Sequence, residues 1–224
     1  MKQPAALSRR RAGQLLLTAS AVGAVSVPML LAGCVSVGVG SDTAEQRMFV
    51  LHDAGSASKL AQPLVAALLL QPLPAGAVAE TLALAYSRRP NELSFYQMAT
   101  WHERPVRQVP RLLAQRLEAR GVAGAVGQIG DPLNGDWLLT VRVDQLQHDV
   151  AVEPGAARVS LTVELFDRRN NTRMARQQFD AQAPVASADS AAAAQALSVA
   201  LSSTFDALVP WLEAEMAQAV AKSL

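Results

Sequence analysis

The sequence predicts an α+β fold, a two-layer sandwich in which a mixed, mostly antiparallel sheet carries two helices on one face. Apolar and polar residues alternate over residues 137–143 and 158–167, which is the period of a strand with one face in water. Apolar residues also fall on a helical stripe over residues 106–117, and a longer stripe runs from Leu197 to Met216. Two helices on one face of the sheet would bury both stripes.

Four strands are expected before the first helix. Residues 47–52 form a short apolar segment, and residues 64–70 form a continuous apolar run flanked by prolines, which is typical of a strand buried on both faces. Residues 80–86 and 92–98 flank the sequence Arg-Arg-Pro-Asn at 88–91, which has the composition of a turn. The two segments therefore predict a hairpin.

The first helix is expected from Val106, with Pro110 near its start, where proline is tolerated, and it should end at Gly121. Its buried stripe should contain Arg116 as well as apolar residues, whereas three other arginines face away (Arg107, Arg111 and Arg120). A strand over residues 122–129 and a turn over residues 130–135 are expected next.

An antiparallel meander of three strands should complete the sheet, with strands at 137–143, 158–167 and 173–181. The last two should join through a tight turn at 169–172, because asparagine tolerates the positive φ that such turns need. The long C-terminal helix follows, and its interior proline, Pro210, is expected to kink it or to mark a join between two helices.

The N-terminus has the form of a secretory signal. Arginines 9–11 precede an uncharged apolar run over residues 15–31, as in the charged and hydrophobic regions of such signals. The string Leu31-Ala32-Gly33-Cys34 that follows resembles the lipobox of bacterial lipoproteins, in which cleavage falls before the cysteine and the thiol carries a diacylglycerol. The alternative is an uncleaved transmembrane anchor, for which the run is long enough. Export by the general secretory pathway is favoured over twin-arginine export, because the hydrophobic pair that follows the arginines in a twin-arginine signal is missing.

The lipobox resemblance divides the chain into a signal peptide (1–33), a lipidated tether (34–46) and a folded domain (47–220). Val35 and Ser36 lack the aspartate that retains enteric lipoproteins in the inner membrane, so the resemblance implies an outer-membrane location on the periplasmic side. The signal removes four basic residues and no acidic one, so the formal net charge of +1 falls to −3 in the mature chain. A mildly acidic surface predicts no nucleic-acid partner.

The sequence offers no set of residues with the spacing of an active site. Cys34 is the only cysteine, which excludes a disulfide within the chain and a thiolate metal cluster. His52, His102 and His148 lie far apart, and no serine has the surroundings of a hydrolase nucleophile. The loop with Asp131, Asn134 and Asp136 lacks the distal glutamate of a calcium loop and is interpreted as a solvated turn. We therefore expect no enzyme, no metal and no cofactor.

Several segments, in this order behind the lipobox, resemble the ABC-type transport auxiliary lipoprotein family, which includes the PqiC-like lipoproteins. The resemblance covers most of the mature chain, and its segments are Met48 to Leu51, Ala85 to Arg88, Glu92 to Tyr96, Trp101 to Pro105, Leu112 to Leu117, Leu165 to Asp167 and Trp211-Leu212. It implies a non-enzymatic protein anchored in the outer membrane through acyl chains on Cys34. Its partner would be an Mce-domain protein of an ABC system, with its permease and ATPase, that moves phospholipids between the inner and outer membranes.

The resemblance also implies candidate partner-binding residues, namely Tyr86, Arg88 and Trp101. The alternative for the two aromatic residues is packing within the fold, and for Arg88 it is a solvated turn. Two other functions stay open, an assembly or chaperone lipoprotein that partners an outer-membrane barrel, and a lipoprotein hydrolase. A homo-oligomer is also compatible with the sequence.

Overall fold

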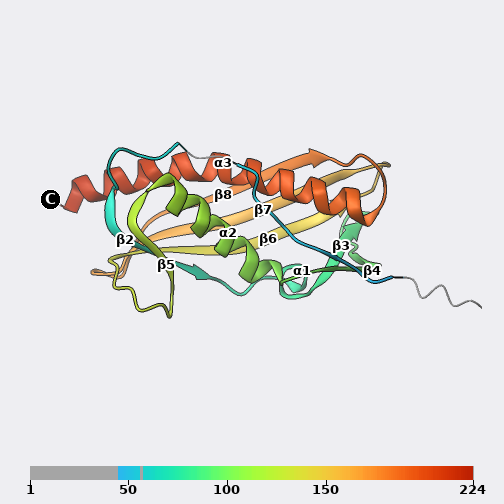
Figure 1. Ribbon diagram of the computed structural model, residues 1–224, viewed down its shortest axis with the longest axis horizontal. Coiled ribbons are helices and arrows are strands. Elements are labelled where there is room, and N and C mark those ends of the chain that lie inside the picture. Colours follow the sequence, from blue (N-terminus) through green and yellow to red (C-terminus); the bar gives the residue numbers. More distant parts are fainter. Residues whose placement is uncertain (1–44, 56–57, 224) are drawn as a thin grey trace, which may run out of the picture. The chain divides into compact units, whose positions relative to one another are not determined.

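The computed structural model describes residues 45–55 and 58–223. The predicted signal peptide, Cys34 and most of the predicted tether therefore lie outside the described residues. The described chain contains eight strands and three helices (Figure 1): β1 (Arg47–Phe49), β2 (Val65–Pro72), α1 (Ala77–Glu80), β3 (Ala83–Ser87), β4 (Ser94–Trp101), α2 (Pro105–Arg120), β5 (Ala123–Gln128), β6 (Trp137–Asp149), β7 (Ala156–Asp167), β8 (Thr172–Pro184) and α3 (Ser190–Ser223).

All eight strands belong to one mixed sheet, and β6 is at its centre. β6 pairs antiparallel with β7 along its whole length, and β7 pairs antiparallel with β8, which confirms the predicted meander. On its other edge, the first part of β6 pairs in parallel with β2, and its last two residues pair in parallel with β3. β5 extends the sheet beyond β2, whereas β4 and then β1 extend it beyond β3.

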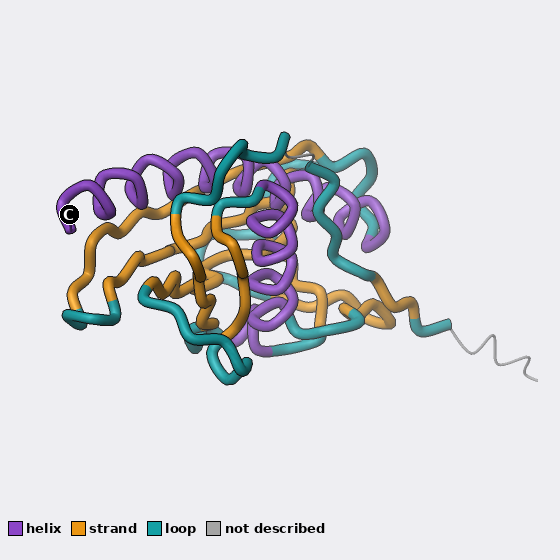
Figure 2. The backbone as a smooth tube through the Cα atoms, turned by 60° about the vertical axis from the view of Figure 1, so that its left-hand side comes forward, coloured by secondary structure: helices purple, strands orange, loops and turns teal. Residues whose placement is uncertain are grey.

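The two long helices cover one face of this sheet, as predicted, and Figures 1 and 2 show them on the same side of the strands. α2 buries Val109, Leu113 and Leu117, and α3 buries a stripe that includes Leu201 and Phe205; all five belong to one hydrophobic core. By length and composition α3 could cross a membrane, but 67% of its most apolar stretch is buried in the domain. It is therefore a core helix here.

The ends of α2 follow from its sequence. Pro105 occupies the first turn, where a missing N–H is not needed, and Gly121 adopts φ 71° at the C-terminal end. Its N–H bonds back to Glu118, which ends the helix in the left-handed conformation that glycine adopts without strain.

Several predicted details of the elements were wrong. Glu80 belongs to the short helix α1 rather than to a strand, since Gly76 and the prolines before it redirect the chain there. The first strand ends at Phe49 because only Arg47 to Phe49 have a partner strand. β6 continues to Asp149, past a bulge between Val143 and Gln145 that interrupts the alternation on which the prediction rested. α3 runs without interruption through Pro210, so that residue does not mark a join.

The segment after β1 crosses the helix layer in extended form and is bound to both long helices. Its backbone takes part in three hydrogen bonds to helix side chains: Gln108 Nε2 to the Leu51 carbonyl (2.7 Å), His52 N–H to Ser198 Oγ (3.3 Å) and Ala54 N–H to Ser202 Oγ (3.0 Å). These bonds satisfy backbone groups that have no strand partner and fix the path of the chain from β1 to β2.

Arg116 fixes the same segment through an ion pair with Asp53. The side chain of Arg116 is 4% exposed; its Nε lies 2.6 Å from Asp53 Oδ2, and its Nη1 lies 2.5 Å from Asp206 Oδ1 on α3. Burial raises the pKa of Asp53, but hydrogen bonds from Arg116 and Ser202 outweigh it, so the pKa lies below its usual value. The predicted placement of Arg116 on the buried stripe is thus confirmed, and an acid partner explains how a cation is tolerated there.

Candidate functional site

The β3–β4 hairpin brings two of the three predicted partner-binding residues together. Tyr86 lies half-buried near the end of β3, and its ring centroid is 4.8 Å from that of Tyr96 on β4. Arg88 follows at the start of the turn, exposed, with its guanidinium carbon 5.4 Å from the centre of the Tyr86 ring. The contact is a cation–π interaction, which restrains an otherwise free arginine at the tip of the hairpin. We call Tyr86, Arg88 and Tyr96 the hairpin platform.

A buried histidine holds the platform in place. The hydroxyl of Tyr96 lies 2.7 Å from Nδ1 of His148, and Nε2 of the same ring lies 2.8 Å from the carbonyl oxygen of Pro154. A carbonyl can only accept, so Nε2 carries the proton and Nδ1 accepts from the tyrosine. Gly155 follows with φ 92°, and a Cβ there would collide with the carbonyl of Asp149. Both ring nitrogens of His148 thus have a hydrogen-bond partner, one in Tyr96 and one in Pro154.

The protonation state of Tyr96 is consistent with its hydroxyl donating a hydrogen bond to His148. Burial raises its pKa, the charges of Asp189 and Tyr86 add to that effect, and Arg88 opposes it. The hydroxyl is thus neutral at ordinary pH and can donate to His148. Its proton is committed to a structural bond, so the arrangement presents a rigid aromatic and arginine surface rather than an acid or base aimed at a substrate.

Trp101, the third candidate, lies apart from the platform. Its side chain is 1% exposed and packs in the hydrophobic core, while its backbone N–H donates to the Leu82 carbonyl at 2.6 Å. In this conformation it cannot contact a partner, and it anchors the end of β4 under the helix layer.

The remaining sequence candidates do not converge. His52 and His102 are exposed and separate from the buried His148. Asp131 accepts a hydrogen bond from the backbone N–H of Gln128 at 2.6 Å, which closes the turn predicted there. Within residues 45–55 and 58–223, no group of His, Cys, Asp and Glu side chains is arranged to hold a metal ion.

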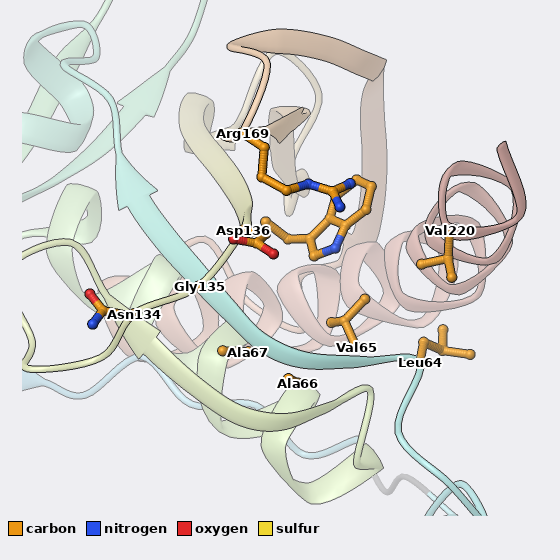
Figure 3. Close-up of a pocket in the computed structure, with 10 residues that line it drawn as sticks. Leu64, Val65, Ala66, Ala67, Asn134, Gly135, Asp136, Arg169 and Val220 are labelled. Atoms are coloured by element: carbon orange, nitrogen blue, oxygen red, sulfur yellow. The ribbon is translucent and has the colours of Figure 1, made fainter. Parts of the chain in front are cut away.

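A cavity of about 310 Å³ opens at the other end of β6 (Figure 3). Leu64, Val65 and Val220 form its apolar side, and Arg169 lies on its polar rim. The guanidinium of Arg169 donates to both carboxylate oxygens of Asp167, at 3.1 and 2.9 Å. The Arg169 side chain is 44% exposed, so this ion pair makes the rim of the cavity polar.

Tyr96 and His148 were not predicted as part of the site. They are 52 residues apart, and neither their spacing nor their neighbours indicates a contact. Only the parallel pairing of Tyr86 with His148 and the antiparallel pairing of Tyr86 with Ser94 bring the three strands together. The lipidation candidate Cys34 lies outside the described residues.

Comparison with known proteins places the chain in a family. No curated protein matches the sequence. Among solved structures, protein XCC0632 from Xanthomonas campestris, assigned to the DUF330 family model, is 22% identical, with a TM-score of 0.70 over 78% of this chain and 99% of that one. An uncharacterized protein is 14% identical, with a TM-score of 0.56 over 70% of this chain and 97% of that one. Both likenesses concern the fold alone. A family model matches residues 49–209, and the chain belongs to that family, the ABC-type transport auxiliary lipoprotein components.

Proposed function

We propose that the protein is a periplasmic lipoprotein, anchored in the outer membrane through Cys34, and an auxiliary component of an Mce-type ABC system that moves phospholipids between the two membranes. Family membership supports the transport role, and the lipobox behind a secretory signal supports the anchor. The protein works by docking rather than by turnover. The observation that carries this mode of action is the hairpin platform, whose ordered arginine and aromatic rings lie at an exposed end of the sheet.

Arginine and tyrosine are the side chains that most often dominate the energy of protein contacts. Arg88 is already oriented by the Tyr86 ring, so binding would cost less side-chain entropy than it does for a free arginine. Tyr86 is in turn supported by Tyr96 and the buried His148. A preorganised surface of this kind suits recognition of another protein, and we take the Mce-domain subunit as that protein.

Reversal of the charge at position 88 should abolish docking. The Arg88→Glu variant is expected to lose binding to a purified Mce-domain protein by at least tenfold, about 1.4 kcal/mol, while its melting temperature stays at the wild-type value. Binding is measured by biolayer interferometry and stability by differential scanning fluorimetry.

Arg89→Glu is the matched control. The side chain of Arg89 is 81% exposed at the same tip and lies 3.6 Å from Glu92. It should bind like the wild type. Equal losses in both variants would indicate a general charge effect, and unaltered binding of Arg88→Glu would remove the platform from the interface.

Cys34 is expected to be the anchor. The Cys34→Ser variant should remain unprocessed and take up no radiolabelled palmitate in cells. Each buried methylene stabilises membrane attachment by about 0.8 kcal/mol and one acyl chain binds only marginally, so at least two chains are needed. Normal incorporation of palmitate in this variant would contradict the anchor.

A further inference from the structure

Exposed apolar side chains gather where the chain enters the domain. Nine large hydrophobic residues are exposed in the described part of the chain, and six of them lie in or beside β1, β3 and β4: Met48, Val50, Leu82, Leu93, Phe95 and Met98. Met48 is 62% exposed, Met98 44% and Phe95 43%. We call Met48 and Phe95 the entry patch; Met98 lies on β4 between Phe95 and Thr100, with φ 55° where the strand pairing is irregular, so register does not fix the face on which it lies. Such clustering distinguishes the six residues from the scattered exposed hydrophobics of an ordinary surface.

Strand register places the patch on the side of the sheet away from the helices. Phe49 pairs with Trp101, which faces the core, so the preceding pair, Met48 with Thr100, faces the other way. Ala85 pairs with Phe95 and alternates with Tyr86, whose ring lies on the helix side with His148. The patch and the hairpin platform thus lie on opposite faces of the same strands.

The same face of the sheet is polar farther from the entry point. Over the meander it carries ion pairs between Arg142 and Asp144 (2.6 Å) and between Arg173 and Glu164 (3.1 Å). The sheet face that no helix covers therefore changes from charged to apolar over β4 and β1. Burial in the core does not explain this change, because these apolar side chains are exposed.

The position of the lipidation candidate indicates what covers the patch. Only thirteen residue steps separate Cys34 from Arg47, the first residue of β1, and they reach at most roughly 45 Å when fully extended. Met48 is therefore among the first described residues to come near the membrane that holds Cys34. Arg47 precedes Met48, and its guanidinium lies 5.2 Å from the Phe49 ring, on the helix side of β1 and so on the face opposite the patch.

We propose that the entry patch rests in the head-group region of the bilayer to which Cys34 is anchored. This inference rests on the acyl anchor of the proposed function. The occupant is a lipid surface, into which exposed apolar side chains insert to a shallow depth. The contact would orient the domain, leaving the hairpin platform on the side that a partner can approach.

The test uses the full, acylated protein in vesicles of phosphatidylethanolamine and phosphatidylglycerol. Cys34 is the only cysteine and its thiol is blocked by the acyl group, so one introduced cysteine can carry a polarity-sensitive fluorophore. Probes are placed by Met48→Cys and by Phe95→Cys. The control is Val199→Cys, a residue 50% exposed on α3 in the helix layer. Flotation with the vesicles first verifies the anchor.

Probes at positions 48 and 95 should shift to shorter wavelength on reconstitution and be quenched several-fold more strongly by brominated lipids than the probe at 199. Equal, weak quenching at all three positions in floating protein would overturn the proposal while leaving the anchor intact. A blue shift that is insensitive to brominated lipids and falls as the protein is diluted among vesicles would also overturn it, since a second copy would then cover the patch. Failure to float would contradict the proposed anchor and, with it, the membrane contact.

Discussion

A Leu201→Asp variant is expected not to fold, because residue 201 is fully buried where α3 packs against the sheet. The charged carboxylate would have to enter the hydrophobic core without a partner. The milder Leu201→Ala change should lower the free energy of unfolding by roughly 2–5 kcal/mol, through lost apolar contacts and a residual cavity. That loss is a large fraction of the net stability of a domain.

Val199→Asp is the control for this prediction. It introduces the same residue two positions earlier in the same helix, but Val199 is 50% exposed. Its melting temperature should stay close to the wild-type value. Circular dichroism and chemical denaturation of the three variants provide the measurement. A native melting temperature for Leu201→Asp would show that this side of α3 does not form the core.

Loss of Arg116 should be nearly as damaging. The Arg116→Leu change leaves Asp53, whose side chain is 9% exposed, without its cation, and removing one member of a buried pair costs roughly 3–5 kcal/mol. The change also removes the bonds that link Asp53 to α2 and α2 to Asp206 on α3. Urea denaturation should therefore show a lower midpoint.

Two further variants isolate the ion pair. Arg111→Leu removes an arginine of the same helix whose side chain is 45% exposed and which pairs with Glu103, and it should cost no more than about 1 kcal/mol. Adding Asp53→Asn to Arg116→Leu should restore part of the loss, because the stranded charge is gone. Equal stability of Arg116→Leu and Arg111→Leu would contradict the role of the buried pair.

Local patterns in the sequence were enough to predict the fold class and most elements. The meander followed from alternation in β6 and β7 and from the turn before β8, and Asn171 indeed adopts the positive φ that this turn needs. α2 followed from its stripe and from Gly121. These features depend on neighbours along the chain, which is why they could be read from the sequence.

The central place of β6 could not be predicted in that way. Its pairing with both β2 and β3 depends on segments that lie more than 60 residues apart. The candidate site could not be predicted in full for the same reason. Tyr86 and Arg88 came from the family resemblance, whereas Tyr96 and His148 join them only through long-range pairing. Trp101 carries no sequence signal that separates an interface residue from a core residue.

The claim that the protein is an auxiliary component of an Mce-type transporter has a direct test. The full, acylated chain is purified from native membranes through a C-terminal tag after mild cross-linking, and its partners are identified by mass spectrometry. We predict enrichment of an Mce-domain protein together with its permease and ATPase, and loss of this enrichment in the Arg88→Glu variant. Recovery of an outer-membrane barrel protein in their place, unchanged by that variant, would contradict the account.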